Sequence, residues 1–549
     1  MMRNLLYLLG IVVATAACSA PAATTADAAA HDVSQAADAD AAQDAAPAVG
    51  PDAADVSDAV ADPCAATACD LGAQRDPKNS CACVDLSVDP SPQGPDFEQR
   101  LCLSAFVWGQ DSTAAAKRAF LWQAAKDLGV HEIRWDFRWE IAEPQKGAYN
   151  WQAIDAAVSE MNAHGIRMLA LLGYGVPWAS QQGTAKGDAM YPPDDPQDFA
   201  NFAGAVAKHV GAAVQHYEIW NEQNAGYRFW KGTPDGIAGD PVAYAKLAHL
   251  AADAVHAANP QALVTFGGLF YINQVIPGAE KFLAASLAAD PTLAAALDGV
   301  SWHPYALYPP MNPPEFANAP GAPVPQIPVD QTAVNMQKIY AQGGAKAKAL
   351  WITELGWPSA PAAQPTAAIS EWQVARFLAR SWVLAASQGT QLLCWYTLTD
   401  GDPAGSGVLW EKYFGLYHFD PDPLDAAPPV PKPAALVHAR LAKLLTGMGF
   451  LADERSRSTA PYQFAFGRAD GTRQVHLAWD PQAKAGAEPK DDGQTPAHFY
   501  RRPGRVYRLA TLAADGPPDA ALPVLAPDAT GRIPFAVGPT PVAIIETAE

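Results

Sequence analysis

Apolar runs of strand length alternate with segments of helical periodicity between residues 101 and 445. Short continuous apolar runs are typical of buried strands, and apolar positions three and four apart are typical of amphipathic helices. Eight such pairs predict one closed (β/α)8 barrel of the TIM type, an α/β fold, over residues 98–449. The expected strands are 102–108, 132–137, 166–172, 214–220, 263–268, 300–303, 349–354 and 392–397. The expected helices are 114–128, 151–163, 198–211, 241–258, 281–289, 332–343, 371–387 and 434–445.

The pattern changes after the last barrel helix. Residues 450–549 hold short strand-like segments separated by turn residues, with no helical period. They predict a C-terminal β-sandwich domain beside the barrel, in keeping with a chain of 549 residues, which is too long for a single core. The expected strands are 462–467, 474–479, 505–512 and 542–546.

The N-terminus predicts export. Residues 1–18 have a basic start, an apolar core too short to span a membrane and a small-residue end, which is typical of a signal peptide. Cys18 follows directly and resembles the lipidated cysteine of bacterial lipoproteins, although Thr15 stands where that pattern usually has leucine. Ser19 resembles the signal for sorting to the outer membrane. We expect an exported bacterial protein, lipid-anchored at the cell surface or outer membrane through Cys18, with plain secretion as the alternative.

Two further segments separate this signal from the barrel. Residues 19–63 consist almost entirely of Ala, Asp, Ser and Pro, too little apolar surface to offset the entropy of ordering, so they predict a disordered tether. Residues 64–97 predict a Cys-rich stalk and linker. Two disulfides are favoured there over a zinc site, because adjacent Cys-x-Cys spacing suits tetrahedral zinc poorly and the chain is expected to be exported. The cysteines concerned are Cys64, Cys69, Cys81 and Cys83.

Charge excludes one class of partner. The net charge of −20 argues against nucleic acid. Residues 19–97 carry 14 aspartates and only two basic residues, so the rest of the chain is mildly acidic and its charge says little about a substrate. The chain has no His-x-His after the first barrel strand and no His-Glu-x-x-His, so we expect no metal and no cofactor.

Two expected barrel strands end in carboxylates. Strand 214–220 runs into Asn221 and Glu222, and strand 349–354 ends at Glu354. These are the fourth and seventh strands, whose tips face each other across a barrel mouth. A pair of carboxylates flanking a sugar can protonate the leaving oxygen and stabilise or attack the anomeric carbon. The sequence therefore predicts a glycosidase with Glu222 and Glu354 as catalytic residues and a carbohydrate substrate.

The same motifs resemble clan A of the glycoside hydrolases, which are retaining enzymes on (β/α)8 barrels. Trp220-Asn221-Glu222 and the sequence Thr-Glu-Leu-Gly-Trp at 353–357 carry this resemblance. It implies that Glu222 is the general acid/base, Glu354 the nucleophile and Asn221 the amide that binds the sugar 2-hydroxyl. Residues 134–151 resemble family 39 and its relatives, which include β-xylosidases, α-L-iduronidases and endo-acting exopolysaccharide hydrolases.

The resemblance also assigns residues around the two glutamates. It implies that Arg134 lies near the nucleophile, that His303 and Tyr305 form a pair after strand six, and that Trp395 is the floor under the sugar. The residues alone leave alternatives open: Arg134 as a partner of Glu218 or Asp136, His303 as a satisfied core histidine, and Trp395 as core packing. Glu218 is interpreted as structural, one layer below Glu222 on the same strand face.

Two further expectations concern the barrel. Trp178 and Trp357, in mouth loops, are candidate sugar platforms. Cys102 and Cys394 lie on the first and last strands, which are neighbours in a closed barrel, so a disulfide and two buried thiols are both open.

The alternative function is a non-catalytic carbohydrate-binding protein of the cell surface on a decayed barrel, although no residue of the motif is missing. If the retaining reading holds, the carboxyl groups of Glu222 and Glu354 should lie about 5–5.5 Å apart, with Glu222 protonated and Glu354 ionised.

Overall fold

The structure is a computed structural model. The expected signal peptide, the tether and most of the Cys-rich segment, Cys64, Cys69 and Cys81 included, lie outside the residues it describes. Within that segment it describes an antiparallel pair, β1 (Ala73–Arg75) and β2 (Cys83–Asp85). The described residues are 73–75, 83–85, 91–105, 112–271, 278–305, 312–316, 327–359, 369–402, 409–419, 429–455, 458, 460–502, 504–512, 521–529 and 531–548.

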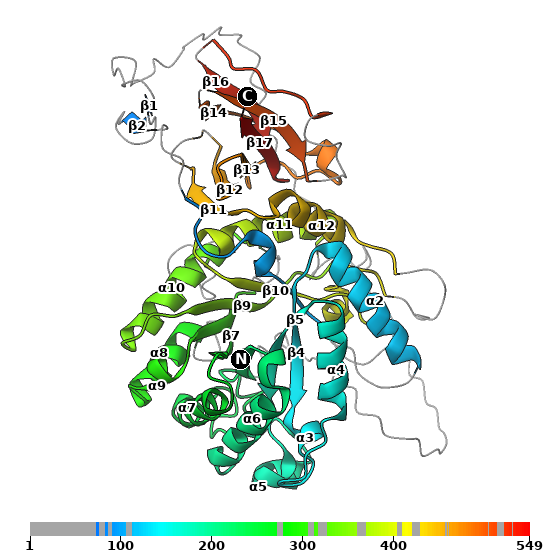
Figure 1. Ribbon diagram of the computed structural model, residues 1–549, viewed down its shortest axis with the longest axis vertical. Helices are drawn as coiled ribbons and strands as arrows, with labels where there is room; N and C mark the ends of the chain where they lie inside the picture. Colours follow the sequence, from blue (N-terminus) through cyan, green and yellow to red (C-terminus); the bar gives the residue numbers. More distant parts are fainter. Residues whose placement is uncertain are drawn as a thin grey trace, which may run out of the picture.

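Eight parallel strands close into a barrel, in the order β10-β3-β4-β5-β6-β7-β8-β9 (Figure 1). The expected α/β barrel is confirmed, with each strand beside its neighbour in sequence and the last strand beside the first. The barrel strands are β3 (Leu101–Ser104), β4 (Glu132–Arg138), β5 (Arg167–Gly173), β6 (His216–Asn221), β7 (Leu263–Phe270), β8 (Gly299–His303), β9 (Ala349–Leu355) and β10 (Leu392–Tyr396).

Helices surround the barrel and bury their apolar faces against the strands, as the periodicity predicts. The main helices are α2 (Ser112–Leu128), α4 (Gln152–Ala163), α6 (Pro196–Val210), α7 (Pro241–Ala258), α8 (Ala279–Ala289), α10 (Val329–Gln342), α11 (Glu371–Ser387) and α12 (Pro433–Leu445). Shorter turns lie between them at η1 (Phe97–Arg100), α3 (Trp139–Ala142), η2 (Pro177–Ala179), α5 (Gln181–Lys186), η3 (Gly211–Ala213), α9 (Leu293–Ala296) and η4 (Leu409–Tyr413).

The main helices match the expected bounds or differ from them by at most three residues at either end, and capping explains the clearest case. Helix α6 begins at Pro196 rather than 198, because the side chain of Asp195 accepts a hydrogen bond from the backbone N–H of Gln197 and proline suits the first helical position. It ends at Val210, since Gly211 adopts φ +53°. The first barrel strand was expected to reach residue 108; β3 ends at Ser104, and residues 106–111 lie outside the described ranges.

The C-terminal region consists of antiparallel sheets. A five-stranded sheet has the order β11-β12-β13-β17-β15, and β14 pairs with β16 in a second sheet. The sheets share a core to which Ala478 and Ile544 contribute from the first sheet and Phe499 and Ile533 from the second. Sequence reasoning found four of these strands and missed β11, β14 and β16. The strands are β11 (Gly449–Asp453), β12 (Tyr462–Gly467), β13 (Arg473–Trp479), β14 (Thr495–Tyr500), β15 (Arg505–Thr511), β16 (Arg532–Val537) and β17 (Val542–Ala548), with η5 (Pro489–Asp491) between β13 and β14.

The sandwich lies against α11 and α12 (Figure 1). Arg376 of α11 donates from Nη2 to Asp492 Oδ1 at 2.7 Å and from Nε to Thr540 at 2.9 Å, both in the sandwich. The ring of Phe97 packs edge-on between Trp382 of α11 and Phe466 of β12. Buried ion pairs and aromatic contacts therefore join the two domains.

A disulfide links Cys102 of β3 to Cys394 of β10, residues that lie opposite each other in register. It joins the first and last barrel strands across 292 residues of sequence, so the disulfide alternative is the one present. Across the described parts of the chain, no helix combines the length and apolar character needed to cross a membrane.

Candidate active site

Glu222 follows the end of β6 in an unusual backbone conformation. Trp220 has φ +69° and Glu222 has φ +47°, a region that bulky residues rarely adopt. Tertiary contacts hold this turn: the indole N–H of Trp220 donates to Phe229 O at 2.7 Å, and the backbone N–H of Glu222 donates to Gly268 O at 2.8 Å. Strain of this kind persists only where surrounding structure imposes it, and it clusters at functional sites.

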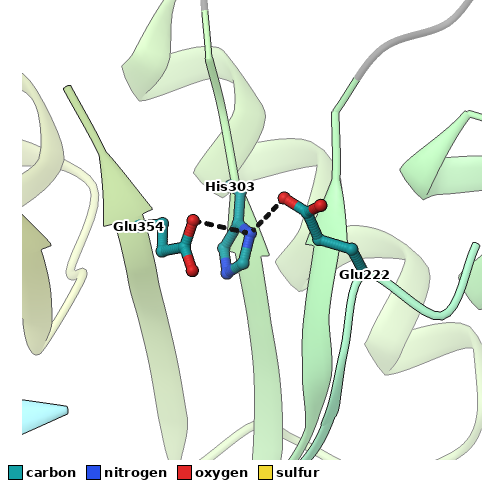
Figure 2. A group of neighbouring side chains, drawn as sticks. All are labelled: Glu222, His303 and Glu354. Atoms are coloured by element: carbon teal, nitrogen blue, oxygen red, sulfur yellow. Dashed lines mark hydrogen bonds and ion pairs between the residues drawn. The ribbon is translucent and has the colours of Figure 1, made fainter. Parts of the chain in front are cut away.

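Glu222 and Glu354 lie on either side of His303, and all three side chains converge at the barrel mouth (Figure 2). His303 Nδ1 is 3.0 Å from Glu222 Oε1 and 3.8 Å from Glu354 Oε2. One oxygen of each carboxylate and a ring nitrogen all lie within 4.8 Å of one another. The two carboxylates are thus close enough to flank a single anomeric carbon.

Arg134 on β4 fixes both the nucleophile candidate and its surroundings. Its guanidinium donates from Nη1 to Glu354 Oε1 at 2.6 Å, from Nε to Glu218 Oε2 at 2.6 Å and from Nη2 to Asn221 Oδ1 at 2.7 Å. The two interpretations of Arg134, as a site residue and as a partner of Glu218, therefore hold together. Burial acts to lower the pKa of Arg134, but the carboxylates of Glu218, Glu354 and Asp136 raise it above its usual value.

The surroundings of Glu354 favour its ionised form. Burial acts to raise its pKa, but the electrostatic effects of His303 and Arg134, with hydrogen bonds from Tyr305 and Arg134, hold the pKa below its ordinary value. The Tyr305 hydroxyl donates to Glu354 Oε2 at 3.0 Å. Burial, followed by the charge of Glu354, raises the pKa of Tyr305 well above its usual value, so this hydroxyl remains a donor.

The three tryptophans expected at the sugar site are packed against other aromatic rings. Trp395 on β10 and Trp357 after β9 are fully buried, with ring centroids 5.9 Å apart. Trp178 packs edge-on against Trp139, and its indole N–H donates to Glu143 O at 2.9 Å. Their roles as floor and platforms stay predictions.

The fold brings here Thr353, to which sequence reasoning gave no role, and Asp136, which it considered only as a partner of Arg134. Thr353, beside the nucleophile candidate, hydrogen-bonds both His303 and Glu218. Asp136 lies two residues beyond Arg134 on the inward face of β4, and burial, outweighing Arg134, raises its pKa to about 6. Its position two residues from Arg134 on the same strand could have marked Asp136 as a candidate site residue.

Two ionisable loop residues lie near Glu222. Burial raises the pKa of Glu411, in η4, to about 8, with Arg228 opposing and Glu222 reinforcing the shift. Arg228, in the loop after β6, has its pKa raised by Glu222 and Glu411 against the opposing effect of burial. No motif marks either residue in the sequence, because their position depends on how the loops fold.

Within the described ranges, Glu222, His303 and Glu354 are the group of acidic and imidazole side chains close enough together to hold a cation. Arg134 already supplies a positive charge 2.6 Å from Glu354. The site therefore stabilises an ionised Glu354 with its own residues.

No family model and no curated protein matches this chain in sequence. Solved structures do match it. A family 39 glycoside hydrolase from the gut symbiont Bacteroides cellulosilyticus WH2 aligns with a TM-score of 0.59 at 20% identity, covering 85% of this chain and 84% of that one. The chain has the fold of clan A glycoside hydrolases.

Two further solved structures show the same likeness. A monomeric β-xylosidase from Caulobacter crescentus CB15 aligns with a TM-score of 0.53 at 17% identity, covering 83% of this chain and 98% of that one. The GH39 enzyme from Xanthomonas axonopodis pv. citri aligns with a TM-score of 0.53 at 18% identity, covering 87% and 97%. The likeness to this glycoside hydrolase fold includes both the barrel and most of the chain after it.

Proposed function

We propose that this protein is a retaining glycosidase that cleaves O-glycosidic bonds of an oligo- or polysaccharide by double displacement. The observation that carries the proposal is the placement of Glu222 and Glu354 on opposed strand ends, with carboxylate oxygens within 4.8 Å of each other. Retaining enzymes hold their carboxyl groups about 5–5.5 Å apart, whereas inverting enzymes leave about 6.5–9.5 Å for a water molecule.

The two steps use the groups as they lie. In the first, Glu354 attacks the anomeric carbon while Glu222 gives its proton to the departing oxygen, which leaves a glycosyl-enzyme ester. In the second, Glu222 takes a proton from water, the resulting hydroxide equivalent attacks the anomeric carbon, and Glu354 leaves as carboxylate. Arg134 and Tyr305, which hydrogen-bond the two Glu354 oxygens, favour that departure.

Asn221 adds support for a sugar ligand. Its amide oxygen accepts from Arg134, so the amide N–H groups are the donors that Asn221 can offer to a ligand. Donors at this position can bind the sugar 2-hydroxyl, an interaction that strengthens in the transition state of glycoside hydrolysis.

The test is a panel of aryl glycosides, beginning with xylosides because one structural neighbour is a β-xylosidase. Product anomers read by proton NMR should show retention, and a mechanism-based fluorosugar should label Glu354. An inverted first product, or a label on another carboxylate, would contradict the assignment. A protein that binds oligosaccharides but turns over none would support the non-catalytic alternative.

We also propose export with a lipid anchor on Cys18, on the basis of the signal-like residues 1–18 and the acidic segment that follows. Cys18→Ser should abolish the added mass of the mature protein and release it from the membrane fraction. An unchanged mass and fractionation would rule lipidation out.

A further inference from the structure

Three buried polar groups form a chain beneath the acid/base residue. Glu218 Oε1 accepts from the hydroxyl of Thr353 at 2.7 Å, Thr353 Oγ1 lies 3.0 Å from His303 Nε2, and His303 Nδ1 lies 3.0 Å from Glu222 Oε1. Glu218, Thr353 and His303 are fully buried, and Glu222 is 4% exposed. These side chains are buried from solvent, so each of them hydrogen-bonds only to its protein partners.

The direction of each hydrogen bond follows from the donor inventory of these groups. Glu218 pairs with Arg134 Nε at 2.6 Å and is an acceptor only. The single hydroxyl proton of Thr353 therefore points to Glu218, and its oxygen can only accept from His303. The ring must then carry a hydrogen on Nε2, which leaves Nδ1 to share one proton with Glu222.

We propose that Thr353 and Glu218 are positioning residues that fix the hydrogen of His303 on Nε2 and so keep Glu222 in its proton-donating form; this inference rests on the proposed glycosidase function. A neutral ring with its hydrogen on Nδ1 would donate to Glu222 and stabilise the ionised carboxylate. The hydrogen bonds from Thr353 to Glu218 and from His303 Nε2 to Thr353 exclude that tautomer. When Glu222 gives its proton to the leaving oxygen, the new carboxylate faces the Nδ1 lone pair, which favours recovery of a proton from the incoming water.

The packing around the ring leaves no competing partner among the described residues. On the β6 side, Glu222 contacts the ring directly and Glu218 contacts it through Thr353. From β9, Glu354 Oε2 lies 3.8 Å from His303 Nδ1. Arg134 on β4 is paired with Glu218 and Glu354. On the β7 side stands Gly268, where an added Cβ would lie 2.2 Å from His303 Nε2 and 2.7 Å from Glu218 Oε1. The ring is therefore held in one plane over the Thr353–Glu218 pair.

The first test reads the tautomer without any substrate. In ¹⁵N NMR of the histidine ring, with His303 assigned by comparison with His303→Gln, Nε2 should carry hydrogen throughout the range from pH 5 to 8. A bare Nε2, or a hydrogen bound to Nδ1 as in the imidazolium, at any pH in that range would overturn the proposal. This measurement does not depend on activity, so it tests the chain of hydrogen bonds even if no glycoside is turned over.

The second test separates acid catalysis from general damage. Thr353→Val removes the hydroxyl at nearly constant volume. We expect kcat/KM on a phenyl glycoside to fall about 10²-fold, the size of a general-acid contribution, and to fall at least about tenfold less on the dinitrophenyl glycoside, whose leaving group needs no proton. The basic limb of the pH profile should move to lower pH by about one unit, and Thr353→Ser should restore most of both effects.

Thr265→Val is the matched control. Thr265 is also a fully buried barrel hydroxyl, hydrogen-bonded to Ser301 at 2.8 Å, and it has no hydrogen bond to His303 among the described contacts. Its variant should keep the wild-type profile. Equal losses on both leaving groups in Thr353→Val, or an unmoved basic limb, would overturn the proposal. A wild-type protein inactive on every glycoside would instead contradict the proposed function and leave the NMR result to decide the tautomer.

Discussion

Two buried histidines in this protein each lie between acidic groups, one in the barrel mouth and one in the β-sandwich. His476 on β13 contacts Glu454 through Nδ1 at 2.6 Å and Glu546 through Nε2 at 3.1 Å. His303 contacts one carboxylate closely through Nδ1 and a hydroxyl through Nε2. Both rings are fully buried.

The two histidines differ in the group that contacts Nε2, a carboxylate at His476 and a hydroxyl at His303. With a carboxylate on each nitrogen, His476 is held as an imidazolium: burial acts to lower its pKa, but Glu454 and Glu546 raise it to about 9. Both ring nitrogens of His476 contact buried carboxylates, so this arrangement stabilises the folded domain. At His303, the hydroxyl of Thr353 fixes one hydrogen on Nε2. In the proposed mechanism, the proton between Nδ1 and Glu222 is the one that Glu222 passes to a substrate. In the proposed mechanism, similar residues thus serve stability in one domain and proton transfer in the other.

The largest effect expected is from Glu354→Ala in the mouth. In the proposed mechanism this removes the nucleophile and should lower kcat by at least about 10⁴-fold, since among the described residues Glu222 and Glu354 are the carboxylates grouped around His303. Azide should partly restore turnover and give a product of inverted configuration, read by NMR. A variant that retained more than a hundredth of wild-type activity without azide would exclude Glu354 as nucleophile.

Glu222→Gln should have a smaller effect that depends on the leaving group. Loss of the acid should lower kcat/KM about 10²- to 10⁴-fold on unactivated glycosides and far less on dinitrophenyl glycosides. Steady-state and burst kinetics on the two substrates check this. A uniform loss on both substrates would mean that Glu222 does not act as the acid.

The equivalent change in the sandwich should affect stability instead. Glu546→Gln leaves His476 with one charged partner, and breaking a buried ion pair from one side should lower the free energy of unfolding by about 3 kcal/mol. Urea denaturation measures this, and kcat of the folded variant should match wild type. A fall in kcat without a change in stability would remove the distinction drawn between the two histidines.

The smallest expected effect is the pH dependence of sandwich stability. The pKa of His476 is raised from 6.5 to about 9 on folding, so its contribution is full below pH 6.5 and is lost as pH rises through 9. Between urea denaturations at pH 6 and pH 9, wild type should lose up to about 3 kcal/mol more than His476→Gln. Parallel curves for the two proteins would show that the ring is not charged in the folded state.

The sequence alone determined the order of elements and the two catalytic candidates, because these depend on local patterns. Apolar runs and helical periods mark strands and helices within ten to twenty residues, and the polar residues at two strand ends mark the mouth. The missed strands β14 and β16 carry Pro496 and Pro534 and form a two-stranded sheet, where proline is tolerated but hides the strand pattern.

Tertiary structure decided how the charged groups pair. Arg134 joins Glu218, Asn221 and Glu354 across 84 to 220 residues of sequence, and Thr353 joins His303 to Glu218 across 50 and 135 residues. Nothing local predicts the protonation of His303 or His476, because the protonation of a buried ring depends on which acceptors the fold brings to each nitrogen. The positions of the site residues can therefore be predicted from local sequence patterns, whereas their protonation states depend on contacts that form only in the folded barrel.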